Sequence, residues 1–119
     1  MNSGNQVWYL DISTLSSASS PIALTDSGYG SSSLEQVLAY NGHLFISDKG
    51  YHRVLAWEDK YDAMAGDAPT AILGATDMND FGPNIGEDSL FWPSEIAMDG
   101  SDLWVGEYKF SGRLVRFSP

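Results

Sequence analysis

The sequence has no cysteine among its 119 residues. Disulfide bonds, thiolate metal ligands and a cysteine nucleophile are therefore excluded. The absence leaves the cellular compartment open, because many secreted proteins also lack disulfides.

Basic residues are scarce: 6 Lys and Arg stand against 16 Asp and Glu, and the formal net charge is −10. A surface with this charge repels phosphate backbones and anionic lipid headgroups, which disfavours nucleic acids and membranes as partners. Basic partners, cations, neutral sugars and peptides remain possible.

Long apolar runs are missing too, and none approaches the roughly 18 residues of a membrane span. The N-terminal stretch MNSGNQVWYLDIS has neither a basic segment nor a sustained apolar core, so we expect no signal peptide. The sequence predicts one small soluble domain of unknown compartment, either mature as it stands or cut from something longer.

Helical patterns are weak, because Gly and Pro interrupt the chain often. The best helical candidate is EDKYDAMAG, residues 58–66, which ends in a glycine as a short helix does. We favour a loop over a helix at this place.

Short segments typical of β-strands fill much of the chain instead. They are rich in Val, Ile, Leu and aromatic residues, and Gly, Asn, Asp, Ser or Pro bound them. The segments are residues 6–12, 22–24, 35–40, 43–48, 53–58, 70–75, 94–99, 102–107 and 113–117. Asn41-Gly42 predicts a hairpin, because a type I′ turn needs positive φ at both central residues. Gly100-Ser101 lies at the equivalent place further along.

Two stretches of the chain repeat each other: QVLAYNGHLFISDKGYHRVLAW, residues 36–57, and EIAMDGSDLWVGEYKFSGRLVRF, residues 95–117. The alignment pairs Val37 with Ile96, Leu44-Phe45-Ile46 with Leu103-Trp104-Val105, Asp48 with Glu107, Arg53-Val54-Leu55 with Arg113-Leu114-Val115, and Trp57 with Phe117. The spacing is 59 positions up to Asp48 and 60 positions from Arg53 onward, so one residue is inserted between them.

A partial third copy lies at the N-terminus, where residues 5–11 match residues 52–58 and residues 20–26 resemble residues 68–77. We therefore interpret residues 1–119 as one domain of repeated four-strand units. Its parts are a partial unit over 1–30, a full unit over 31–77 and a partial unit over 88–119.

Four short antiparallel strands form one blade of a β-propeller, and the residues resemble NHL repeats. The resemblance rests on Leu44, Phe45, Ile46, Asp48, Arg53, Val54, Leu55 and Trp57 in one unit, and on Pro93, Ile96, Ala97, Asp99, Leu103, Trp104, Val105, Arg113, Leu114 and Phe117 in the other. It implies an all-β fold of antiparallel four-stranded blades, a partial propeller of about two.

Propellers close with roughly four to eight blades, so two blades leave strand edges and apolar faces open. The chain is a fragment of a longer propeller, a subunit of an assembly, or an open two-blade structure. We expect self-association through blade edges into a homo-oligomer.

Two pairs of opposite charges flank predicted turns: Asp48 with Arg53, and Glu107 with Arg113. Carboxylate and guanidinium groups on neighbouring strands form ion pairs with several hydrogen bonds. Because the pairing recurs in each unit, we interpret it as a structural clasp rather than a catalytic site.

Catalytic and metal motifs are weak. The histidines, His43 and His52, lack metal-site spacing, and we expect both to be surface or half-buried residues. Asp77, Asn79 and Asp80 form only a fragment of a Ca²⁺ loop. We expect no cofactor and no metal ligands, with Ca²⁺ or Zn²⁺ as the ions to consider.

Aromatic residues near the blade tips are the candidate binding residues: Tyr51, Trp92, Tyr108 and Phe110. The first hypothesis is a binding or scaffold module for a protein, peptide or carbohydrate. The alternative, which the NHL resemblance implies, is a metal-dependent lyase or hydrolase with its site in the central channel of an assembled ring. The enzyme question stays open, with a non-enzyme favoured.

Overall fold

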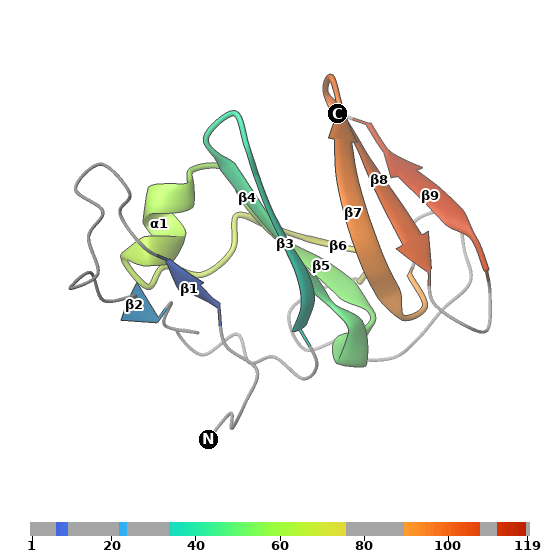
Figure 1. The fold of residues 1–119 in the computed structure, drawn as a ribbon, viewed down its shortest axis with the longest axis horizontal. Coiled ribbons are helices and arrows are strands. Elements are labelled where there is room, and N and C mark those ends of the chain that lie inside the picture. Colours follow the sequence, from blue (N-terminus) through green and yellow to red (C-terminus); the bar gives the residue numbers. More distant parts are fainter. Residues whose placement is uncertain (1–6, 10–21, 24–33, 76–89, 108–111, 119) are drawn as a thin grey trace, which may run out of the picture.

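The computed structural model describes residues 7–9, 22–23, 34–75, 90–107 and 112–118. These residues form mostly antiparallel β-sheet with little helix, which confirms the all-β expectation. Figure 1 shows three sheets arranged along the chain, with the middle sheet between the other two.

The first sheet pairs β1 (Trp8–Tyr9) with β2 (Ile22–Ala23). The second sheet has four strands in sequence order, and the third sheet has three in sequence order. The second comprises β3 (Leu34–Tyr40), β4 (His43–Asp48), β5 (Arg53–Trp57) and β6 (Ala71–Leu73). The third comprises β7 (Pro93–Asp99), β8 (Asp102–Glu107) and β9 (Leu114–Phe117).

The strand registers confirm the predicted repeat residue by residue. Val37 pairs with Ile46 in the second sheet, and the aligned residues Ile96 and Val105 pair in the third. Leu44 pairs with Trp57 as Leu103 pairs with Phe117. Both first strands also carry an irregularity near their start, between Leu34 and Gln36 and between Pro93 and Ile96. The two sheets are therefore built on one plan.

The two hairpin turns differ in backbone conformation. Asn41 and Gly42 both have positive φ, 50° and 82°, as the type I′ prediction requires. In the second turn only Gly100 has positive φ, at 62°, which is typical of a type II′ turn with glycine first. The repeat thus keeps the hairpin position but changes its turn type.

The preference for a loop over residues 58–66 is wrong, because α1 (Lys60–Met64) is a short helix. The Asp59 carboxylate caps it by accepting a hydrogen bond from the backbone N–H of Tyr61 at 2.9 Å. Ala63 is buried against the second sheet, and Gly66 follows the helix with φ of 90°. A cap, one buried contact and a terminating glycine stabilise a helix too short to show periodicity.

The middle sheet has an apolar cluster on each face, because successive strand residues point to opposite sides. Leu44, Ile46, Leu55 and Trp57 form cluster 1, against which Val7 packs. On the other face, Val54 joins cluster 2 with residues of the third sheet. Cluster 2 also contains Leu90, Ile96, Leu103, Val105 and Val115.

No helix in the described part of the chain is both long and apolar enough to cross a membrane.

Candidate functional site

The two predicted charge clasps both form, at the same end of the two sheets. Arg53 donates from Nε to Asp48 Oδ2 at 3.0 Å, and both side chains are fully buried. Arg113 donates from Nε to Glu107 Oε1 at 2.5 Å and from Nη2 to Oε2 at 2.9 Å. Its hydrogen bond with Glu107 raises the pKa of Arg113, despite an opposing effect of burial. The first clasp joins the end of β4 to the start of β5, and the second joins the end of β8 to the residue just before β9.

The segment just before β7 contacts His52, the residue next to Arg53 of the first clasp. The backbone N–H of Trp92 donates to His52 Nδ1 at 3.0 Å, and the two rings stack with 7° between their planes. Phe91 meets the same imidazole edge-on, with 5.4 Å between ring centroids. The backbone N–H of Phe91 donates to Glu107 Oε2 at 2.6 Å, so this segment links the second clasp to His52. We call Tyr51, His52, Phe91 and Trp92 the turn-end cluster.

His52 is buried, so the expectation of a surface or half-buried residue is wrong for this histidine; His43 is half-buried. Burial lowers the pKa of His52, although the Asp48 carboxylate acts in the opposite direction. The hydrogen bond from Trp92 further requires that Nδ1 carry no proton. His52 therefore serves as a neutral acceptor for the backbone of the segment just before β7.

The candidate binding residues fall into two groups. Tyr51 and Trp92 are half-buried at this end of the sheets, and the Arg53 guanidinium lies 5.3 Å from the centroid of the Tyr51 ring. Tyr108 and Phe110 lie outside the described residues, as does the acidic stretch with Asp77, Asn79 and Asp80. The sequence did not point to Phe91, and it raised His52 only as a metal ligand. Their ring contact joins positions 39 apart, and no local pattern predicts it.

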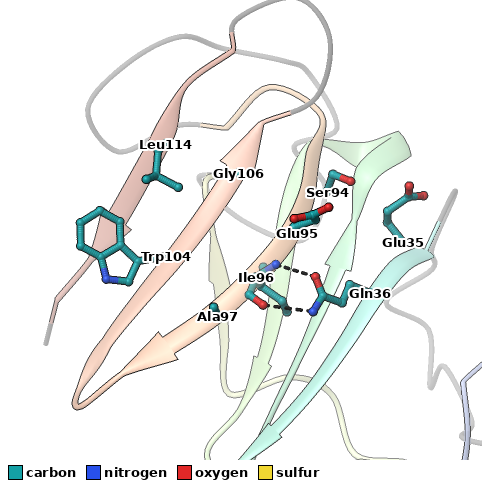
Figure 2. A pocket seen from close by; sticks show the side chains of 9 residues that line it. All are labelled: Glu35, Gln36, Ser94, Glu95, Ile96, Ala97, Trp104, Gly106 and Leu114. Carbon is teal, nitrogen blue, oxygen red and sulfur yellow. Dashed lines mark hydrogen bonds between the residues drawn. The ribbon is translucent and has the colours of Figure 1, made fainter.

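A second candidate is a groove of ≈ 540 Å³ beside β3 and across β7–β9 (Figure 2). Its wall on β3 carries Gln36, whose amide binds both backbone groups of Ile96. Gln36 Nε2 donates to the Ile96 carbonyl at 3.1 Å, and its Oε1 accepts from the Ile96 N–H at 2.7 Å. The remaining lining residues are Glu35, Ser94, Glu95, Ala97, Trp104, Gly106 and Leu114.

Ser47 forms a second polar link between the sheets. Its Oγ accepts from the Gln36 N–H at 2.9 Å and donates to the Ser94 carbonyl at 2.8 Å. Ser47 is fully buried, so this hydroxyl sits inside the contact between the second and third sheets. Together with the Gln36 amide it fixes how β7 lies against β3 and β4.

The two histidines are not brought together. His43 begins β4 and binds the Glu58 carbonyl through Nδ1 at 2.6 Å, whereas His52 lies at the other end of the β4–β5 hairpin. Within the described ranges, no group of three or more His, Asp or Glu residues is placed to hold a metal ion.

No match to this chain was found among protein-family models, curated proteins or solved structures.

Proposed function

We propose that this chain is an NHL-like propeller module that binds a protein or peptide segment at its turn-end cluster and works as part of an assembly of several chains. Two features support the propeller interpretation. The sheets share one register plan, and β7 of the third sheet packs on β3 and β4 of the second. Face-to-face contact between successive antiparallel units is the arrangement of blades.

The observation that carries the binding proposal is the backbone conformation at His52 and Trp92. Both have positive φ, 57° and 47°, a conformation that costs non-glycine residues of order 1–3 kcal/mol. A bulky aromatic residue is especially rare there. The chain nevertheless holds a half-buried Trp ring nearly parallel to the His52 imidazole at this place, with 6.3 Å between the ring centroids. Strain that surrounding hydrogen bonds maintain is typical of ligand-binding positions.

The chemistry of the cluster favours a partner with apolar and cationic groups. Trp92 and Phe91 supply half-buried aromatic rings, which gain contact area at low entropic cost. The chain's net charge of −10 attracts basic segments over a long range at low salt. A basic peptide with aromatic or aliphatic side chains therefore fits best.

Nothing in the described residues favours the metal-dependent lyase or hydrolase. That function needs several ligands near one axis, and the two histidines lie at opposite ends of one hairpin.

The test is binding of immobilised chain to libraries of basic, neutral and acidic peptides, with a glycan array in parallel. We expect basic peptides to bind and Trp92→Gly to abolish binding, while Tyr61→Ala, on α1, leaves it intact. Circular dichroism establishes that both variants are folded. Equal binding by Trp92→Gly, or no peptide binding at all, would refute the proposal. Binding to glycans and to no peptide would mean that the partner is a carbohydrate and not a protein segment.

A further inference from the structure

Two exposed apolar side chains on the sheets are repeat equivalents of buried ones. Val54 is fully buried, but its equivalent Leu114 is 67% exposed. Ile96 is 4% exposed, but its equivalent Val37 is 44% exposed. In the described residues the remaining exposed large apolar side chain is Tyr61, which lies on α1 and outside the repeat.

Val54 and Ile96 lie on opposite sides of one contact. Both belong to cluster 2, between the second and third sheets. Val54 comes from the face of β3–β5 that meets the third sheet, and Ile96 comes from the face of β7–β9 that meets the second. Leu114 and Val37 are therefore exposed residues on the two faces that are suited to the same kind of contact.

The open face of the third sheet repeats the covered face of the second, position by position. Glu95, Ala97, Trp104, Gly106 and Leu114 stand where Gln36, Leu38, Phe45, Ser47 and Val54 stand one unit earlier. All five of the later residues line the groove of Figure 2. The apolar residues stay apolar, since Leu, Phe and Val become Ala, Trp and Leu.

We propose that this open face of β7–β9 docks the Val37 side of β3–β4 of a second copy of the chain, head to tail. The partner is a second copy because each chain carries both surfaces of the repeated contact, the open face of β7–β9 and the Val37 side of β3–β4. The surfaces are unlike, so the interface is heterologous and continues into a closed ring or an open filament. This inference names the interface for the assembly in the proposed function and rests on that part of it, but not on the peptide-binding part.

The polar part of the contact changes between units. Gln36 donates to one backbone group of Ile96 and accepts from the other, whereas the equivalent Glu95 carboxylate can only accept. Ser47, which bonds the Ser94 carbonyl, is replaced by Gly106. The contact between copies is thus weaker than the contact within a chain, and Glu95→Gln restores the missing donor.

Docking also requires a small rearrangement of the receiving copy. Val7, equivalent to Val54 and Leu114, already packs on cluster 1 of that copy. Leu114 of the docking copy would occupy the position that Val7 holds in the receiving copy. In the proposed contact, β9 of the docking copy therefore displaces β1 of the receiving copy. Within the described residues, β1 and β2 form two residue pairs, Trp8 with Ala23 and Tyr9 with Ile22.

Sedimentation over a range of concentrations tests the interface. We expect mass to rise with concentration, and to rise further in high salt, because both copies are acidic. Leu114→Lys should weaken association by about tenfold to a hundredfold, the effect of losing one buried Leu. Glu95→Gln should strengthen it, and Tyr61→Lys should leave it unchanged. A monomer at every concentration, or equal effects of Leu114→Lys and Tyr61→Lys, would overturn the proposal.

Cross-linking tests the orientation, since the chain offers a background without cysteine. Because Gln36 bonds Ile96 within one chain, their equivalents Glu95 and Val37 should meet between copies. We expect a short bis-maleimide to link Val37→Cys to Glu95→Cys in a mixture, and to link neither variant to itself. Links within a single-variant sample, or none in the mixture, would exclude head-to-tail docking. Peptide binding by the same samples is measured separately, so either proposal can fail alone.

Discussion

The backbone N–H of Trp92 donates to Nδ1 of His52 at 3.0 Å, and the Trp92 and His52 rings lie nearly parallel. Forty positions apart in sequence, these residues attach the start of the third sheet to the turn of the second.

This contact predicts a pH dependence of stability. The folded chain holds His52 neutral with a lowered pKa, while the unfolded chain has the ordinary value of 6.5. Below pH 6.5 the unfolded state therefore binds more protons, and stability falls as pH drops toward the lowered folded pKa. Urea denaturation from pH 7.5 to 5.5 should show that His52→Asn, which tolerates the same positive φ, loses less stability than the parent chain. Parallel pH curves would contradict the prediction.

The strained backbone at Trp92 predicts an unusual order of substitutions. At φ of 47°, alanine retains the steric cost of a Cβ atom and glycine does not. Trp92→Gly should therefore be more stable than Trp92→Ala by about 1 kcal/mol, the reverse of the order in regular strands. Thermal and urea unfolding of the two variants measure the difference.

The two clasps should contribute different amounts to the free energy of unfolding. Arg53→Ala leaves the fully buried Asp48 carboxylate without its guanidinium, which costs about 3–5 kcal/mol. The Arg113 side chain is 27% exposed, so water partly replaces it, and Arg113→Ala should cost about 1–2 kcal/mol. Denaturant midpoints compare them. If Arg53→Ala does not fold, Arg113→Ala must still fold; the opposite order would contradict the structure.

Two glycines with similar φ provide a matched steric test. Gly42 and Gly74 have φ of 82° and 88°, so alanine is strained equally at both. A Cβ at Gly42 meets open space, but at Gly74 it would lie 2.7 Å from Leu90 Cβ. Gly42→Ala should cost about 1 kcal/mol, and Gly74→Ala a further 1–3 kcal/mol from overpacking. Urea denaturation measures both, and equal losses would mean that Leu90 does not pack there.

Gln36→Glu is the reverse of the Glu95→Gln substitution, made at the equivalent position within one chain, and it should lower stability. Gln36→Glu keeps the bond from the Ile96 N–H but loses the donor to the Ile96 carbonyl. We expect a loss of about 1–2 kcal/mol in unfolding free energy. Glu35→Gln, at the neighbouring partly exposed position, should change it by much less. Urea denaturation of the two variants checks this.

Much of the fold was predictable from local patterns. The repeat alignment predicted that β3–β5 and β7–β9 are equivalent strands, and their registers agree because side-chain alternation ties each strand to one register once a face is buried. Asn41-Gly42 marked its hairpin through its backbone preference. Residues 58–66 were harder, because a five-residue helix depends on one cap and one buried alanine rather than on periodicity.

Local patterns were enough to predict the repeated strand units and the pairing of acid with arginine across each turn, since both depend on neighbours within a few residues. How one sheet packs on the next depends on contacts between residues that are distant in the sequence. The contacts of His52 with Trp92 and of Gln36 with Ile96 join residues 40 and 60 positions apart. No local preference encodes such contacts, and they form only when two sheets with the same plan pack face to face.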